Sequence, residues 1–146
     1  MKKILSVLFL LITVGFSQQT FAAEDDKPFA EERIVLQISD PNPFKQTLVL
    51  NVANNLVKHY GPDKVDVEIV AFGPGLRLLF KDNVNTNRIE GLSSSGVKFS
   101  ACKNTIKGMS KKLGHTPELN SNAVAVSAGV VRIIDLKNQG FKLIKP

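Results

Sequence analysis

Cys102 is the only cysteine in this chain of 146 residues, and it lies where an apolar alternating segment gives way to a helical pattern. Residues 97–101 have the alternation of a strand, and the residues after the cysteine have the pattern of a helix. The first N–H groups of a helix have no partners within the helix, and they favour a negative charge. A cysteine in this position can be held as the thiolate, which is its nucleophilic form. The sequence therefore predicts a reactive thiol at this junction.

Lys103, Asn104 and Thr105 follow the cysteine and add one cation and two polar side chains. A cation at the start of a helix is unfavourable for the helix dipole, so attraction to a thiolate or a persulfide would explain Lys103. Asn104 and Thr105 could donate hydrogen bonds to a sulfur species on Cys102. Simpler interpretations also fit: Lys103 begins a solvated helix face, and Asn104 and Thr105 cap the first turn.

The elements that must position this thiol alternate between strands and helices along the chain. The predicted strands span residues 33–39, 65–72, 97–101, 122–126 and 141–144. The predicted helices span residues 43–60, 85–92, 103–113 and 130–138, with a helical turn at 76–80. This alternation with short connections indicates a parallel sheet that is covered by helices on both faces. We predict an α/β fold, a flavodoxin-like three-layer sandwich with a mainly parallel five-stranded sheet.

Ligands of open parallel sheets bind outside the carboxyl ends of the strands, near the point where the strand order reverses. Glycine-rich segments at these ends let the backbone approach a guest closely and leave N–H groups facing it. We expect the strand order to reverse beside Cys102. With the residues that follow Cys102, the predicted crevice is lined by Gly73, Pro74, Gly75, Ser127 and Gly129.

The beginning of the chain has the pattern of a secretory signal peptide. Lys2 and Lys3 precede an apolar run at 4–16, and small residues lead to a predicted cut after Ala22. The apolar run is shorter than the ~20 residues that span a bilayer. We predict a signal peptide at 1–22, a mobile leader at 23–32 and one domain at 33–146. The product would be periplasmic or secreted, with no membrane association after the signal is removed.

Composition and motifs argue against several classes of function. Loss of Lys2 and Lys3 with the signal lowers the formal charge from +6 to +4, and the single Tyr offers few of the aromatic platforms used by nucleic-acid binders. The Gly-Pro-Gly segment at 73–75 lacks the third glycine of a dinucleotide fingerprint. His59 and His115 have no metal-ligand spacing. We therefore expect no nucleic-acid partner, no cofactor and no metal.

Four segments together resemble the DsrE/DsrF-like family: residues 35–39, 71–76, 96–105 and the closing stretch 128–146. The likeness covers nearly all of residues 33–146. It implies a flavodoxin-like fold, assembly into homo-oligomers that are trimers or hexamers, and a cysteine that carries sulfur as a persulfide between relay proteins. Cys102 occupies the matching position. The sulfur relays of this family work in the cytoplasm, whereas this chain begins with an export signal.

The leading hypothesis is an exported thiol protein in which Cys102 accepts a sulfane sulfur as a persulfide and passes it to an acceptor thiolate. Its donor or acceptor would be a protein or a small thiol, and the sulfur must not be buried away from every cleft. An alternative is a non-catalytic oligomeric module that binds a small ligand or serves assembly, in which Cys102 only packs. A third is a peroxide-reducing or disulfide-exchanging thiol, although this chain has no second, resolving cysteine. Whether the protein turns over as a sulfurtransferase is open at this point.

Overall fold

The five strands predicted from the sequence are all present and form one sheet in which every pairing is parallel. The structure is a computed structural model that describes residues 27–146, so the predicted signal peptide at 1–22 lies outside the described residues. The strands are β1 (Glu32–Ile38), β2 (Val65–Ala71), β3 (Lys98–Cys102), β4 (Ala123–Val126) and β5 (Lys142–Ile144). The predicted α/β fold class with a five-stranded parallel sheet is therefore confirmed.

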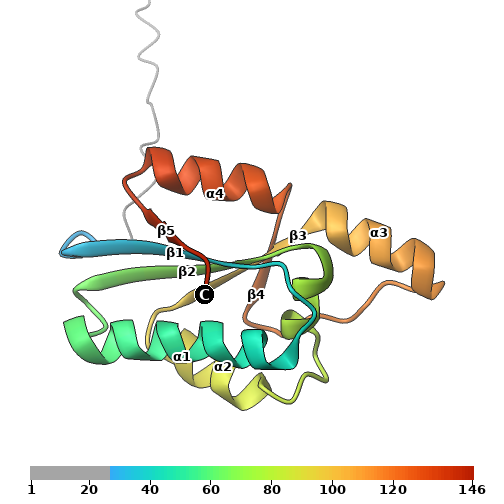
Figure 1. Ribbon diagram of the computed structural model, residues 1–146, viewed down its shortest axis with the longest axis horizontal. Coiled ribbons are helices and arrows are strands. Elements are labelled where there is room, and N and C mark those ends of the chain that lie inside the picture. The colour runs from blue at the N-terminus through green and yellow to red at the C-terminus, as the bar shows by residue number, and fades with distance from the viewer. Residues whose placement is uncertain (1–26) are drawn as a thin grey trace, which may run out of the picture.

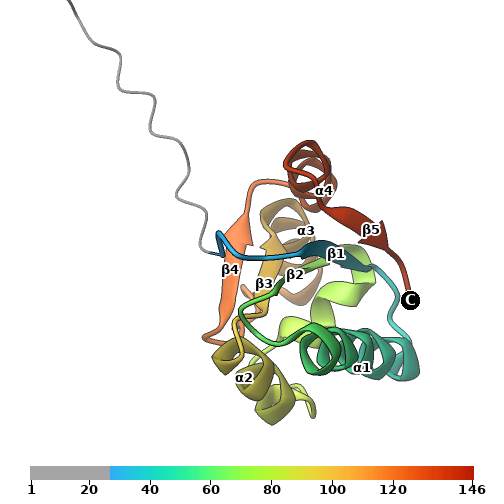
Figure 2. The ribbon, with the colours of Figure 1, turned by 90° about the vertical axis from the view of Figure 1, so that its left-hand side faces the viewer.

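The helices connect these strands and cover both faces of the sheet. They are α1 (Pro43–Tyr60), the 3-10 helix η1 (Gly73–Leu79), α2 (Thr86–Ser94), α3 (Lys103–Leu113) and α4 (Gly129–Asn138). Helices α1 and α2 lie on one face and α4 lies on the other, which gives the three layers (Figures 1 and 2). Between residues 27 and 146, no helix is both long enough and apolar enough to cross a membrane.

The strand order is β4-β3-β2-β1-β5. The chain adds β2, β3 and β4 one after another on one side of β1, and it then returns to place β5 on the other side. The order therefore reverses between β1 and β5. The expectation that it reverses beside Cys102 is wrong, because Cys102 ends β3 and β2 separates that strand from β1.

Helix α1 shows how local signals determine an element. The side chain of Asn42 caps it by accepting a hydrogen bond from the backbone N–H of Phe44 at 2.9 Å, and Pro43 takes the first helical position. Gly61 ends it with φ of 93°, and the N–H of Gly61 donates to the carbonyl of Val57 at 2.9 Å. Both ends lie where the sequence predicts them.

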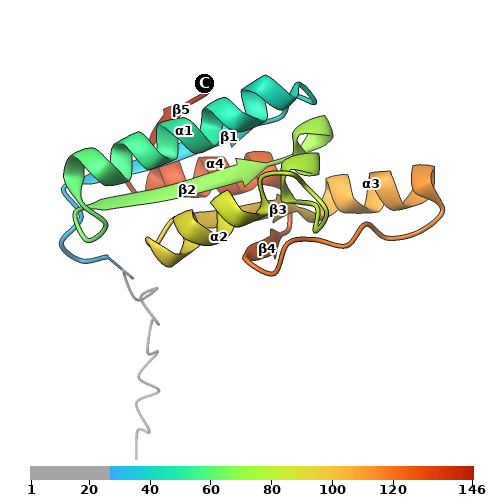
Figure 3. The same ribbon diagram turned by 90° about the horizontal axis from the view of Figure 1, so that it is seen from below.

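Helix α3 is the least embedded of the helices. It extends away from the sheet beyond the carboxyl ends of the strands (Figures 1 and 3), and none of its residues is buried. Ile106 and Met109 pack partly against the main core, as their helical spacing predicts. Leu113, one turn further along, is 49% exposed because the end of the helix lies beyond the sheet. The protruding helix begins at the predicted thiol.

Strand β2 is buried along its whole length, including Asp66 and Glu68. Charged residues that alternate with apolar ones, as at 65–68, are typical of a strand with one exposed face, but the structure buries both faces here. Glu68 accepts two hydrogen bonds from the guanidinium of Arg132 on α4, at 2.7 and 2.6 Å, and one from the hydroxyl of Ser100 on β3. Asp66 lies 3.6 Å from the ammonium of Lys98. Charge pairing across elements therefore permits burial that the strand pattern alone does not indicate.

The described part of the predicted leader lies against the start of the sheet. The ammonium of Lys27 donates hydrogen bonds to the carbonyls of Pro62 and Val65 at 2.7 and 2.9 Å. Glu31 forms an ion pair with Lys64 at 2.6 Å, and β1 begins at the next residue. The chain thus enters the sheet from the end opposite to the predicted thiol.

Candidate thiolate site

Cys102 is both the last residue of β3 and the N-cap residue of α3. Its backbone is extended, with φ of −69° and ψ of 114°. The side chain lies at the start of the helix and makes no capping hydrogen bond. A neutral thiol is a weak hydrogen-bond acceptor, whereas a thiolate is a strong one. The position is therefore suited to the ionised form of the side chain.

The electrostatics of Cys102 favour the thiolate. Burial raises the pKa of the thiol, but donors around the sulfur outweigh this effect and hold its pKa below the ordinary value. These donors are the hydroxyl of Thr105 and the backbone N–H groups of Thr105, Gly129 and Asn104. The helix N–H groups and the Thr105 hydroxyl were predicted from the sequence as donors, whereas the ammonium of Lys103, which was predicted to attract the thiolate, is not among the causes of the lowered pKa. Two helix N-termini, those of α3 and α4, thus meet at one sulfur.

Thr105 is oriented by the loop that follows β2. The backbone N–H of Gly73 donates to the Thr105 hydroxyl oxygen at 2.9 Å, which leaves the hydroxyl proton free to point at the sulfur of Cys102. Gly73 has φ of +53°, in the left-handed region that favours glycine. A residue of the 3-10 helix η1 therefore positions a donor on α3.

Gly129 brings the N-terminus of α4 close enough to act on the sulfur. A Cβ atom on Gly129 would lie 2.9 Å from both the Cβ and Cδ1 atoms of Phe72. A larger residue would therefore push the first turn of α4 away from the end of β2. The absence of a side chain permits the approach that the site needs.

The predicted crevice residues divide into three groups. The Thr105 hydroxyl and the backbone N–H groups of Asn104, Thr105 and Gly129 act on the sulfur, and Gly73 orients Thr105. The side chain of Asn104, which the sequence predicts as a donor, is not among these groups. Gly75 is buried against the backbone of β1, where it fixes η1. The remaining three, Lys103, Pro74 and Ser127, have exposed side chains and are not among the groups that act on the sulfur.

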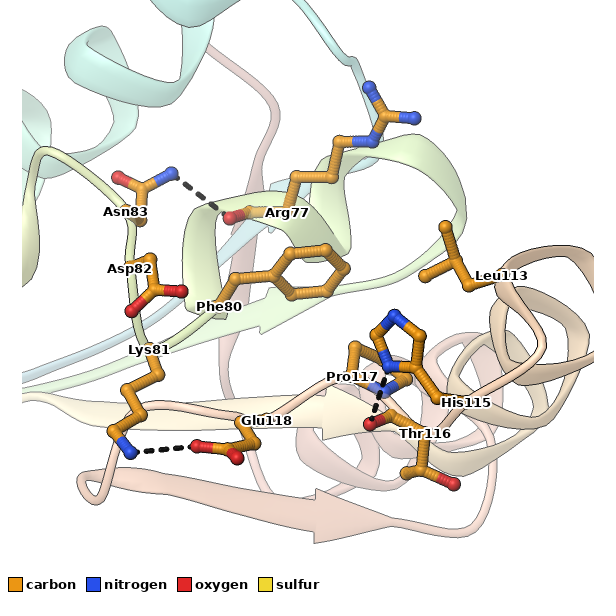
Figure 4. A pocket seen from close by; sticks show the side chains of 10 residues that line it. All are labelled: Arg77, Phe80, Lys81, Asp82, Asn83, Leu113, His115, Thr116, Pro117 and Glu118. Carbon is orange, nitrogen blue, oxygen red and sulfur yellow. Dashed lines mark hydrogen bonds and ion pairs between the residues drawn. The ribbon is translucent and has the colours of Figure 1, made fainter.

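The sulfur itself is poorly accessible, because Cys102 is only 5% exposed. A cavity of about 680 Å³ lies at the other end of α3, between the loop that follows η1 and the residues around Leu113, and Cys102 does not line it. Figure 4 shows the Phe80 ring facing Leu113 and His115 across this cavity, with the ion pair of Lys81 and Glu118 at one side. A molecule that reacts with Cys102 must therefore present its sulfur on a slender group.

The described residues contain no group of three or more His, Cys, Asp or Glu side chains that could hold a metal ion. Exposed His115 has its Nδ1 atom 3.3 Å from the carbonyl oxygen of Thr116, in the wall of the cavity.

Replacing Thr105 with valine is expected to raise the pKa of Cys102. The substitution keeps the shape of the side chain but removes a donor to the thiolate, and a hydrogen bond to a charged group contributes about 1.5–3 kcal/mol. Since the wild-type thiolate forms as the pH rises through a lowered pKa, the variant should need a higher pH to ionise. The thiolate fraction at neutral pH should fall about tenfold, measured by the ultraviolet absorbance of the thiolate during a pH titration.

Thr105→Ser is the matched control because it keeps the hydroxyl. We expect its titration curve to stay close to that of the wild type. An unchanged curve for Thr105→Val would show that the Thr105 hydroxyl does not act on the sulfur.

The fold and the site together define an α/β protein with a thiolate-stabilising cysteine at a strand-to-helix junction. No protein-family model matches the chain, and no curated protein was found to match it. Among solved structures, the chain is similar to protein MTH1491 of Methanobacterium thermoautotrophicum, a protein of unknown function. The TM-score is 0.71 and the identity 26%, over 80% of this chain and 100% of the other.

The chain is also similar to the YchN protein of E. coli, with a TM-score of 0.64 over 79% of this chain and 99% of the other. The identity of 14% means that this likeness concerns the fold alone. Both matches support the fold expected from the family resemblance.

Proposed function

We propose that this protein is an exported, DsrE-like thiol protein that carries sulfane sulfur as a persulfide on Cys102. The observation that carries the proposal is the set of donors from α3 and α4 that together lower the pKa of a lone cysteine. The motifs around residues 71–76 and 96–105 and the likeness to two solved structures with this fold support the same assignment. Export rests on the pattern of residues 1–22, and the periplasm or the exterior is the proposed location.

The proposed chemistry is a pair of sulfur transfers without net oxidation. The Cys102 thiolate attacks the outer sulfur of a donor persulfide, forming a new S–S bond while the donor's own S–S bond breaks and its thiolate leaves. An acceptor thiolate then attacks the outer sulfur on Cys102, and the cysteine leaves again as a thiolate. Cys102 is a thiolate before it accepts the sulfur and again after it has passed the sulfur on. The Thr105 hydroxyl and the helix N–H groups therefore stabilise both the nucleophile of the first transfer and the leaving group of the second.

Intact-mass spectrometry after exposure to a polysulfide donor tests this function directly. We expect the protein lacking residues 1–22 to gain one or more sulfur atoms, and a reductant should remove them. The Cys102→Ser variant should gain none, since it lacks the sulfur nucleophile. An unmodified wild-type protein with a demonstrably reduced thiol would contradict the proposal.

A second candidate is a non-catalytic oligomeric module, in which Cys102 only packs. Its support is the 5% exposure of Cys102, together with apolar side chains that α4 presents to solvent. These are Val130, Val131 and Ile134, at 55%, 48% and 51% exposure. They would suit a homo-oligomeric contact, and the cavity beside α3 would suit a small ligand. Sedimentation of the wild type and Cys102→Ser, with identical assembly and no sulfur uptake by either, would favour this candidate.

A further inference from the structure

The exposed face of α3 is uniformly basic. Lys103, Lys107 and Lys111 follow one another at intervals of four residues, so their side chains lie on one side of the helix. All three are exposed, and this set is called the lysine stripe below. The face opposite the stripe carries Ile106 and Met109, which pack against the core. The stripe therefore points away from the domain.

No carboxylate neutralises the lysine stripe. The sequence has no Asp or Glu between Glu90 and Glu118, and among residues 27–146 no ion pair or hydrogen bond involves the side chain of a stripe lysine. Some other exposed lysines of the domain are paired with carboxylates, for example Lys64 with Glu31 and Lys81 with Glu118. The positive potential of the stripe is thus left uncompensated by the part of the chain that the structure describes.

The arrangement is unfavourable for an isolated helix. Like charges four residues apart repel each other, and Lys103 adds a cation at the positive end of the helix dipole. Helix α3 buries none of its residues, so little packing energy offsets this repulsion. An acidic surface laid along the stripe would remove the repulsion and stabilise the helix.

We propose that the lysine stripe is the docking surface for an acidic segment of a partner protein that presents a cysteine to Cys102. The inference rests on the proposed sulfur-carrier function and identifies the chemistry of its partner. The stripe starts at the residue next to the sulfur, and α3 extends from that point beyond the sheet (Figure 3). A partner segment aligned on α3 would place its own thiol at the N-terminus of the helix. Since Cys102 is 5% exposed, an extended segment can reach it more readily than a flat protein surface can.

Thiol–disulfide exchange with charged peptides tests the docking surface without knowledge of the natural partner. Two synthetic peptides carry a single cysteine as a mixed disulfide with thionitrobenzoate, one flanked by glutamates and the other by lysines. The Cys102 thiolate attacks the peptide sulfur, a protein–peptide disulfide forms, and coloured thionitrobenzoate leaves as the thiolate. At about 0.01 M salt we expect the acidic peptide to react about tenfold faster or more, and at about 1 M salt the difference should largely disappear.

The triple variant Lys103→Glu, Lys107→Glu, Lys111→Glu should reverse the preference at low salt. A matched control changes the charge equally at distant, exposed positions, with glutamate replacing Lys58, Lys137 and Lys145. The control should retain most of the preference for the acidic peptide. If the glutamate triple variant loses helical circular dichroism, the corresponding glutamine variant serves instead, and it should abolish the preference.

Equal rates for the two peptides with the wild type at low salt would overturn the docking surface. So would an equal loss of preference in the stripe variant and the control, because net charge and not the stripe would then be responsible. Sulfur uptake from inorganic polysulfide is measured on the same samples. Normal uptake with equal peptide rates contradicts only the docking surface, whereas absent uptake contradicts the proposed function.

Discussion

Replacement of Arg132 with methionine is expected to lower the free energy of unfolding by about 3 kcal/mol. Glu68 is 1% exposed and accepts two hydrogen bonds from this guanidinium, at 2.7 and 2.6 Å. Removal of one partner of a buried ion pair leaves an uncompensated charge, which costs about 3–5 kcal/mol. We take the lower end because the Arg132 side chain is 32% exposed. Urea denaturation at constant pH measures the change.

Two further variants distinguish the stability lost by leaving Glu68 charged and unpaired from the stability lost with any contact. Addition of Glu68→Gln to Arg132→Met should recover most of the stability, since the charge is gone and the amide oxygen can still accept the Ser100 hydrogen bond. Lys81→Met is the surface control, because its ion pair with Glu118 is equally short, at 2.7 Å, but exposed. It should change the stability little, because solvent screens an exposed ion pair. Similar losses for Arg132→Met and Lys81→Met would contradict the account of the buried pair.

Replacement of Gly75 with alanine is expected to destabilise the fold by about 2–3 kcal/mol and to disturb the thiol. A Cβ atom at this position would lie 2.5 Å from the carbonyl oxygen of Ile38 and 2.7 Å from the Cα atom of Ser39. Both are backbone atoms at the end of β1, so neither can swing aside as a flexible side chain could. Helix η1 must then shift, and the N–H of Gly73 moves with it away from Thr105. We therefore also expect the pKa of Cys102 to rise.

Gly91→Ala is the control, and we expect it to raise the stability of the fold instead of lowering it. Gly91 lies inside α2, and a Cβ atom there would meet nothing within 4 Å. Alanine in the interior of a helix is more stable than glycine by about 0.5–1 kcal/mol, so this variant should gain stability and leave the pKa of Cys102 unchanged. Denaturation and thiol titration of both variants check the pair of expectations. A fully stable Gly75→Ala with an unchanged thiol would show that η1 does not support the site.

Local chemistry explains why the positions of the secondary-structure elements could be predicted. Asn42, Pro43 and Gly61 determine the two ends of α1 through contacts within a few residues. The junction at Cys102 is equally local, since a strand pattern ends there and a helical pattern begins. Gly73 and Gly129 were placed near the thiol by a general rule, because the carboxyl ends of parallel strands meet at one edge of the sheet.

The sequence by itself thus determined the parallel α/β architecture, the thiol at a helix start and the residues that follow the strand ends. Only the tertiary structure decided that β5 pairs with β1, because strand order depends on partners far away in the chain. It also decided the burial of Glu68, whose partner Arg132 is 64 residues away. The lowered pKa of Cys102 depends on the tertiary structure in the same way: burial raises this pKa, and donors from two helices and a loop outweigh burial only once the fold brings them together.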